Sequence, residues 1–454
     1  MAAAASSALR VPLTARLAAC TSFKRRPISP LPTALQQFPS PTKIALSSTL
    51  LARKSTKFAN STKFLSSSPA SPRLPVQQLP AGRRSLVGVT SAAATSASDP
   101  AATSANSDTS ANPTASAGPA MVQTAVQETS ADGAFKRTPS AFRSLITADG
   151  SSGFPAVAGR YHLYVSYACP WACRCLMTLK LKGLEDAISV TVVEPVWKKT
   201  REGEDHFGWP FVPPGGTAVV EGAESDPLNK ALFVRDVYEK ADPYAAKFSV
   251  PVLWDKETGT IVNNESSEIM RMFNSEFNAI AKHPQVDIYP AHLRAAIDEV
   301  NEWVYPSINN GVYRCGFATK QAPYEEAFKE LFSALGRCED ILSRQRFIAG
   351  DTFTEADIRL FVTLIRFDEV YVVHFKCNRN FIRDFPNLFN YTKEIFQLPG
   401  IASTVNMAHI KSHYFRSHPS INPFGIIPGG QGTDYTMPHD RSRLPDVALP
   451  CGKM

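Results

Sequence analysis

The residue best suited to chemistry in this sequence is Cys169, which stands between a predicted strand and a predicted helix that begins at Pro170. A proline at the first helical position marks a helix start and leaves Cys169 as the N-cap. The free N–H groups and the dipole of a helix N-terminus stabilise a thiolate, the nucleophilic form of cysteine. The position therefore predicts a nucleophile with a lowered pKa, and the alternative is an inert, buried cysteine.

Two further cysteines follow on the same predicted helix. Cys173 is four residues beyond Cys169, whereas the thiols of a C-x-x-C redox pair are three residues apart, so Cys173 is poorly placed to resolve a disulfide. Cys175 falls on the apolar face of the helix and is predicted to lie in the core. A zinc site of these three cysteines with His162 would match no standard ligand spacing, and we predict no metal.

A second helix start, at Glu265-Ser266, is predicted directly after a strand. Free N–H groups at such an end bind carboxylates, although Ser266 as a plain N-cap would give the same pattern. Lys247 precedes another predicted strand, and its charge could pair with a carboxylate of a ligand. Trp209, in the Gly- and Pro-rich stretch GWPF, is a candidate lid residue or a packed aromatic side chain.

Three tyrosines in the C-terminal half could assist a thiolate, namely Tyr313, Tyr371 and Tyr414. A tyrosine hydroxyl close to a thiolate donates a hydrogen bond that lowers the pKa of the thiol, or it serves as a general acid. The spacing of these tyrosines does not by itself bring them to Cys169. For each one, a structural position in the core or at the surface stays the alternative.

The elements around Cys169 follow the order β-α-β and then β-β-α. Alternating and β-branched residues predict strands at 162–167, 189–193, 250–255 and 259–263, and apolar residues at helical spacing predict helices at 170–183 and 266–274. This order is the thioredoxin plan. A proline inside a strand is otherwise awkward, and in this plan Pro251 would be the cis-proline that faces the active site.

Strand signals end near residue 276, and the rest of the body has the pattern of helices. Apolar residues at helical spacing mark helices around 297–304 and 328–342. The stretch 348–367 contains Thr354 and Asp357 in a capping-box arrangement, and its helix is apolar nearly all round, so it should be buried centrally. The predicted fold is a thioredoxin-like α/β domain followed by an all-helical domain.

The ends of the chain differ in composition from the body. The first 98 residues hold 13 Lys or Arg, no acidic residue and many Ser, Thr and Pro, which is typical of a transit peptide to an organelle. This composition favours a plastid (chloroplast) over a mitochondrion, and a cytosolic protein with a disordered basic tail is the alternative. We predict a transit peptide, a disordered low-complexity linker, a thioredoxin-like domain, a helical domain and a loose tail, with the bounds 1–93, 94–134, 135–275, 276–428 and 429–454.

Composition and charge argue against several classes of protein. The 454 residues carry a net charge of +7, but beyond the first 98 residues there are 35 basic and 41 acidic side chains, a net of −6. A mildly acidic body argues against a protein that binds nucleic acid through phosphates. No stretch approaches 18 apolar residues, which argues against a membrane span. Eight scattered cysteines without a secretory signal favour a reducing compartment.

Several motifs, taken in order, resemble the xi-class glutathione transferases, also called glutathionyl-hydroquinone reductases, in the plant and algal type with an N-terminal extension. Within residues 135–424 the motifs are GRYHLYVSYACPWA, TVVEPVW, GWPF, SVPVLWDKETGTIVNNESSEIMRMFN, NNGVY, FDEVY, HFKCN and IK-x-HYF. The resemblance implies a thioredoxin-like domain, a helical glutathione-transferase domain and a homodimer. It also implies the reduction of glutathionyl-hydroquinones, with glutathione as the co-substrate and without a metal or nucleotide.

The resemblance further implies roles for single residues. Cys169 would be the nucleophile and Tyr313 the proton donor or acceptor. Two tyrosines, Tyr371 and Tyr414, would support the thiolate. Glutathione would be held by Trp209, by Lys247, Phe248, Ser249 and Val250, and at its γ-glutamyl end by Glu265 and Ser266.

Two positions depart from the family pattern. The family commonly has Arg where Lys247 stands, and because lysine keeps the charge but loses the bidentate fork, the affinity for glutathione could be weaker. Family members usually carry another residue where Cys173 stands, so a side disulfide under oxidation is conceivable for this chain. Neither departure affects Cys169.

Two other functions would use the same framework. An omega-like thiol transferase or dehydroascorbate reductase would also need a cysteine, but the tyrosine motifs argue against it, because they resemble the aromatic pocket of the reductases. A non-catalytic interaction module, as in the gamma subunits of elongation factors, would need neither Cys169 nor the Glu265-Ser266 pair. Passage through a glutathione-affinity column without retention would favour such a module.

Overall fold

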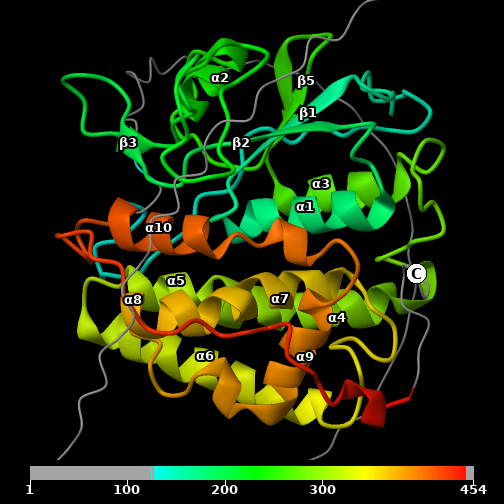
Figure 1. Cartoon of the computed structure of the whole chain (residues 1–454), viewed down its shortest axis with the longest axis vertical. Coiled ribbons are helices and arrows are strands. Elements are labelled where there is room, and N and C mark those ends of the chain that lie inside the picture. Colours follow the sequence, from blue (N-terminus) through cyan, green and yellow to red (C-terminus); the bar gives the residue numbers. More distant parts are fainter. Residues whose placement is uncertain (1–123, 125–126, 446–454) are drawn as a thin grey trace, which may run out of the picture. The chain divides into compact units, whose positions relative to one another are not determined.

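The structure, a computed structural model, describes residue 124 and residues 127–445, all of which belong to the unit from Ser107 to Met454 (Figure 1). The predicted transit peptide at 1–93 and most of the predicted linker lie outside the described residues. Within the described part, an α/β domain comes first in the chain and a helical domain follows it.

A four-stranded mixed sheet forms the core of the first domain, in the order β2-β1-β5-β6. β1 (Tyr161–Val165) and β2 (Ser189–Val192) are parallel, and β5 (Val252–Asp255) is antiparallel to both β1 and β6 (Thr260–Asn263). Each strand overlaps a strand predicted from the sequence. β1 is buried along its whole length, as expected of a central strand.

Two helices of this domain begin and end close to the predicted positions. α1 (Pro170–Lys182) ends at Gly183, whose φ of 63° is the left-handed conformation that glycine adopts without strain. α3 (Ser266–Ser275) packs beside α1 on the same side of the sheet (Figure 1). The Val250–Pro251 peptide bond is cis, as the thioredoxin plan predicts. The first domain therefore has the thioredoxin-like fold.

A long insertion separates β2 from β5. It contains a two-stranded ribbon, β3 (Lys198–Lys199) and β4 (Phe207–Gly208), and one helix, α2 (Val234–Ala241). The N–H of Glu194 donates to the carbonyl of Pro210, and the N–H of Phe211 donates to the carbonyl of Leu232. These hydrogen bonds fix the GWPF stretch against the edge of the domain.

The second domain is helical, as predicted. Its α-helices are α4 (Arg294–Val304), α5 (Gly311–Gly316), α6 (Gln321–Leu342), α7 (Glu355–Arg366), α8 (Val372–His374), α9 (Pro386–Phe396) and α10 (Met407–Ser417). α7 is buried over nearly its entire length and packs against α1, α4 and α9. It begins with the predicted capping box, in which the Thr354 N–H donates to Oδ2 of Asp357 at 2.8 Å. Within residues 127–445, no helix has both the length and the apolar character needed to cross a membrane.

The predicted linker 94–134 extends too far, because residues 127–134 are held by the folded body. Thr129 pairs with Phe135 in a β-bridge, and Glu128 forms an ion pair with Lys247 at 2.5 Å. Phe135 itself is buried. Small polar residues dominate the composition of this segment. The sequence alone therefore did not indicate that the Glu128 carboxylate anchors it through an ion pair with Lys247.

The predicted loose tail 429–454 is also wrong where the structure describes it. Tyr435 is buried, and the fully buried Arg441 donates hydrogen bonds to backbone carbonyls at residues 342, 345 and 346. The Gln397 side chain donates to the carbonyl of Tyr435 at 2.8 Å. Two anchoring side chains therefore fix a segment that its overall composition predicts to be loose.

Candidate active site

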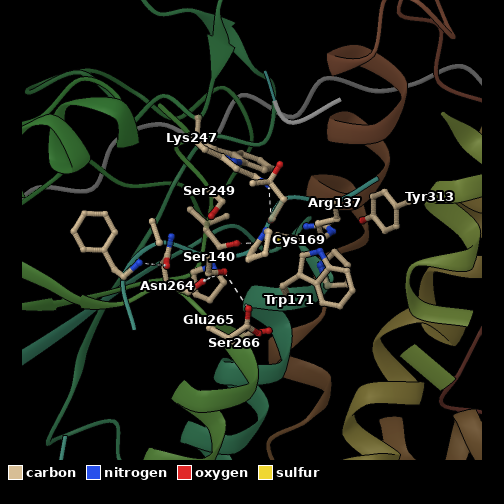
Figure 2. Close-up of a pocket in the computed structure, with 18 of the residues that line it drawn as sticks. Arg137, Ser140, Cys169, Trp171, Lys247, Ser249, Asn264, Glu265, Ser266 and Tyr313 are labelled. Carbon is tan, nitrogen blue, oxygen red and sulfur yellow. Dashed lines mark hydrogen bonds between the residues drawn. The ribbon is translucent and has the colours of Figure 1, made fainter. Parts of the chain in front are cut away.

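A cavity of about 540 Å³ opens at the N-termini of α1 and α3 (Figure 2). One side, which we call the polar wall, consists of Lys247, Ser249, Glu265 and Ser266. The opposite side, the aromatic wall, consists of Trp171, Tyr305, Tyr313, Phe317 and Tyr414. Cys169 lies between Glu265 and Tyr313 in Figure 2. Of the residues predicted to form a site, all line this cavity except Phe248 and Tyr371.

Cys169 is the N-cap of α1, and Pro170 is the first residue of the helix, as predicted. The side chain is almost completely buried. Its thiol donates to the carbonyl oxygen of Val250 at 3.4 Å, directly before the cis-proline. The backbone N–H groups of Trp171 and Ala172 point at the sulfur. The turn therefore presents donors to a sulfur anion, as at other helix N-termini.

The predicted direction of the Cys169 pKa is wrong. Burial raises the pKa of this thiol above its ordinary value, and the N–H groups of Ala172 and Trp171 together with two guanidinium groups oppose this rise without overcoming it. The two guanidinium groups belong to Arg137 and Arg366. A helix start can be read from the sequence, whereas the loss of water around the sulfur depends on both domains.

Arg366 was not predicted, although it holds the turn before Cys169. It lies at the end of α7 and is fully buried. Its Nη2 donates to the carbonyl of Tyr167 at 2.9 Å and its Nε to the carbonyl of Ala168 at 3.1 Å. An arginine near the end of a helix predicted to be buried centrally was the available signal, because a buried cation needs a partner.

The structure brings the three predicted tyrosines together. The hydroxyl groups of Tyr313 and Tyr414 are 2.6 Å apart, and those of Tyr414 and Tyr371 are 3.0 Å apart. Tyr371 does not line the cavity, because it is fully buried behind Tyr414 at the end of a π-helical turn, Phe367–Tyr371. Burial raises the pKa of each tyrosine, so all three hydroxyls stay protonated at neutral pH. They form a chain of donors that ends at the cavity.

The cap of α3 is Glu265 and not Ser266. Oε1 of Glu265 accepts a hydrogen bond from the N–H of Ser267 at 3.2 Å, and Ser140 donates to Oε2 at 3.0 Å. Ser266 is the first helical residue and is buried against the cavity. The carboxylate of Glu265 is thus fixed at the mouth of α3, in the position of an acceptor for a cationic group.

The segment from Lys247 to Val250 is divided between the cavity and the core. Nζ of Lys247 reaches Glu128 and also donates to the carbonyl of Thr138 at 3.1 Å. Phe248 packs against Arg235 on the other side of the segment, with the guanidinium carbon 5.4 Å from the ring centroid. The Phe248 side chain therefore does not line the cavity, since neighbouring residues of an extended segment point to opposite sides, and the role of the segment in holding a peptide stays a prediction.

Trp209 lines the cavity as a fixed wall residue, not as a lid. Its ring stacks on His413 with centroids 4.5 Å apart and meets Trp197 edge-on at 5.4 Å. Nδ1 of His413 lies 2.9 Å from the carbonyl oxygen of Pro195. Burial lowers the pKa of His413 to about 3, so the imidazole is neutral. These contacts hold Trp209 from two sides and leave it almost completely buried.

Arg137 and Trp171 also belong to the site and were not predicted. The guanidinium carbon of Arg137 lies 4.7 Å from the ring centroid of Trp171 and 5.4 Å from that of Tyr313. Figure 2 shows Arg137 between Cys169 and Tyr313. Trp171 belongs to the same CPWA motif as Cys169, so the sequence could have predicted that Trp171 lies near the thiol. Arg137 lies 32 positions earlier in the chain, and only the folding of its segment onto the cavity brings it there.

The other cysteines of α1 turn away from the cavity. The Cys173 thiol donates to the carbonyl of Thr404 at 3.6 Å, and the Cys175 thiol to the carbonyl of Ser266 at 3.7 Å. Both side chains are fully buried, and Cys175 lies in the core as predicted. In the part of the chain that the structure describes, no three His, Cys, Asp or Glu side chains are grouped so that they could hold a metal ion.

Two family models match the two domains. The glutathione S-transferase N-terminal domain matches residues 168–276, and the glutathione S-transferase C-terminal domain matches residues 321–394. The first match includes Cys169, the cis-proline and the Glu265-Ser266 pair. The second covers α6, α7 and most of α9.

Two relatives match about two thirds of this chain. The glutathionyl-hydroquinone reductase YqjG of Escherichia coli is 49% identical over 319 residues, which cover 69% of this chain and 93% of the relative. The glutathionyl-hydroquinone reductase PcpF of Sphingobium chlorophenolicum is 47% identical over 302 residues, which cover 66% of this chain and 91% of the relative.

Solved structures agree with these relatives. The glutathione-bound structure of YqjG from Escherichia coli superposes with a TM-score of 0.62 at 49% identity and covers 66% of this chain and 96% of that chain. The xi glutathione transferase from Phanerochaete chrysosporium superposes with a TM-score of 0.62 at 51% identity and covers 67% of this chain and 100% of that chain.

Proposed function

Because this chain belongs to the xi class of the glutathione transferases, we propose that it is a glutathionyl-hydroquinone reductase that uses glutathione as its co-substrate. The observation that carries the proposal is the position of Cys169 between a wall of charged and polar groups and a wall of tyrosines. A peptide conjugated to an aromatic ring needs both surfaces, with its sulfur at the boundary.

The polar wall suits the peptide part of the substrate. The carboxylate of Glu265 can accept from the ammonium group of the γ-glutamyl residue, and Lys247 can pair with a peptide carboxylate. Ser249 and Val250 precede the cis-proline, where an extended peptide meets the backbone of the thioredoxin fold. The cavity volume of about 540 Å³ lies within the range of roughly 300–1,000 Å³ that small-molecule pockets span.

The first half-reaction releases the hydroquinone. The Cys169 thiolate attacks the glutathionyl sulfur of the conjugate, a sulfur–sulfur bond forms, and the carbon–sulfur bond breaks with its electron pair on the ring. Tyr313 donates a proton to the ring carbon, and the Tyr414 and Tyr371 hydroxyls behind it stabilise the tyrosinate through hydrogen bonds. The products are a free hydroquinone and a mixed disulfide of Cys169 with glutathione.

The second half-reaction restores the enzyme. The thiolate of a second glutathione attacks the glutathionyl sulfur of the mixed disulfide, and Cys169 leaves as a thiolate. One conjugate and one glutathione thus give one hydroquinone and one oxidised glutathione. The N–H groups at the start of α1 stabilise Cys169 both as nucleophile and as leaving group.

Steady-state turnover tests this proposal. The full chain, supplied with glutathionyl-menadiol and glutathione, should release menadiol and oxidised glutathione in equal amounts, and Cys169→Ser should abolish both while it keeps glutathione binding. Near-normal turnover by Cys169→Ser would contradict the proposed role of Cys169 as the nucleophile. Reduction of a small mixed disulfide or of dehydroascorbate, without release of menadiol, would identify the omega-like alternative.

We further propose that residues 1–93 direct the protein to the plastid and that the mature protein is a homodimer. The acid-free, Ser- and Arg-rich composition supports the first part, and family membership supports the second. A fluorescent fusion of residues 1–134 should enter chloroplasts, and entry into mitochondria would contradict the proposal. Sedimentation of the full chain should give twice the mass of one chain.

A further inference from the structure

Arg137 is the one cavity-lining cation among the described residues that has no acidic partner. Three cationic side chains, Arg137, Arg143 and Lys247, line the cavity. Arg143 donates to Glu268 at 2.7 Å, and Lys247 pairs with Glu128. Within residues 127–445 no carboxylate pairs with Arg137, and its Nε is buried without a hydrogen-bond partner. A buried, unpaired donor on a cation is costly unless an anion meets it at some stage of the reaction.

The position of Arg137 indicates which part of a substrate would carry that anion. Its guanidinium lies over the rings of Trp171 and Tyr313, so it belongs to the aromatic wall and not to the polar wall (Figure 2). Its charge opposes the burial that raises the pKa of Cys169 and Tyr313, and it acts in the same direction as the burial that lowers the pKa of Lys247. The peptide carboxylates of glutathione have Lys247 and the α3 N-terminus as partners, whereas the aromatic part of the conjugate has Arg137.

We propose that Arg137 is the residue that receives the negative charge of the departing aromatic ring, an inference that rests on the proposed function. With the phenolic proton released, Tyr313 first protonates the ring carbon that bears the sulfur, which gives the keto form of the ring. When the carbon–sulfur bond then breaks, its electron pair passes through the ring to the carbonyl oxygen, and the guanidinium holds the resulting phenolate until it takes up a proton. The site thereby selects glutathionyl conjugates of phenols and hydroquinones, whose oxygen can carry the charge, over conjugates of aromatic rings without a hydroxyl group.

Turnover of two substrates tests this role. Arg137→Gln should lower kcat/KM for glutathionyl-menadiol roughly 10²-fold, as loss of one preorganised oxyanion donor does. It should lower the reduction of the glutathione mixed disulfide of 2-mercaptoethanol much less, because that leaving group never reaches the aromatic wall. Arg137→Lys should recover part of the activity. Lys136→Gln, at the exposed neighbouring position, is the matched control and should behave as the wild type.

Two results would overturn the role. Equal losses on both substrates would mean that Arg137 acts only through the Cys169 thiolate. A large rise in KM for glutathione, with kcat retained, would mean that it binds a peptide carboxylate. Each variant should have a melting temperature close to that of the wild type, so that a change in kinetics reflects the site and not a loss of folded protein.

A binding experiment makes the inference independent of turnover. 4-Nitrophenol bound to the full chain should ionise at a lower pH with the wild type and with Lys136→Gln than with Arg137→Gln, as followed by the absorbance of its phenolate. Identical titrations would overturn the anion site even if the enzyme releases menadiol. A shift that depends on Arg137, in a chain that releases no menadiol, would keep the anion site and reject the proposed function.

Discussion

The polar wall and the aromatic wall of the cavity are built in different ways. The polar wall comes from the first domain alone, and its residues precede a cis-proline or begin a helix. The aromatic wall is assembled from α1, α5, α10 and the turns next to α5, and its members range from Trp171 to Tyr414 in the chain. Its hydroxyl groups contact each other across these segments. On the proposed function, the first domain binds the glutathione part of the conjugate. The interface of both domains stabilises the charge of the aromatic ring and supplies its proton.

The largest effect on the aromatic wall is expected from Tyr414→Phe. This change removes the hydroxyl that joins Tyr313 to Tyr371 and should lower kcat for glutathionyl-menadiol roughly 10²-fold, the scale of general acid catalysis. The KM for glutathione should stay unchanged, because the polar wall is intact. Steady-state kinetics give both numbers. Tyr324→Phe, whose hydroxyl donates to the carbonyl of Lys376, is the control, and an equal loss there would contradict the division.

The reactivity of Cys169 should depend steeply on pH. Because its pKa is raised, the thiol is mostly protonated at neutral pH, and alkylation by iodoacetamide should accelerate roughly tenfold per pH unit toward the raised pKa. Arg137→Gln removes an opposing positive charge and should move the midpoint to still higher pH. Peptide mass spectrometry measures the rate at this residue. A plateau below pH 8 would show that the N-terminal donors outweigh burial.

A smaller effect, confined to binding, is expected from Glu265→Gln. The amide can still cap α3 through its oxygen but loses the charge that would meet an ammonium group, so the KM for glutathione should rise about tenfold at similar kcat. The comparison variant is Glu276→Gln, which alters a carboxylate that accepts from the Ala148 N–H outside the cavity. A fall in kcat without a change in KM would place Glu265 in the chemistry instead.

The smallest effect is expected from Glu128→Gln. The Glu128 carboxylate forms an ion pair with the Lys247 ammonium group, so its loss should free this group to bind glutathione. The KM for glutathione should fall by up to about fivefold, the scale of a partly exposed ion pair. Isothermal titration with glutathione provides the direct measurement. Weaker binding in Glu128→Gln would show that the ion pair positions Lys247 rather than competing for it.

The same comparison explains what the sequence could predict. Strands, the start of α1, the cis-proline and the capping box of α7 depend on neighbouring residues, so pattern and spacing predict them. The roles of the tyrosines came from the family resemblance, and no local pattern could show that their hydroxyls form a chain. Burial around the sulfur likewise depends on both domains, which is why the direction of the Cys169 pKa was predicted wrongly.

Side chains that act far from their place in the sequence were missed for a related reason. Arg137 and Glu128 lie in or beside a stretch of small polar residues, and Arg366 ends an apolar helix. Each is held by partners that are distant in the chain, so the local sequence placed Glu128 in a linker and gave no role to Arg137 or Arg366. The predicted bounds of the linker and the tail were wrong for the same reason, because single side chains with distant partners, such as Arg441, anchor these segments.

The most direct test of the central claim is a single-turnover experiment on the full chain without free glutathione. One equivalent of glutathionyl-menadiol should release one equivalent of menadiol and leave glutathione on Cys169, detected by peptide mass spectrometry, and added glutathione should remove it as oxidised glutathione. Release of menadiol that requires free glutathione from the start, or an unmodified Cys169 after release, would contradict a mixed disulfide formed at the boundary of the two walls.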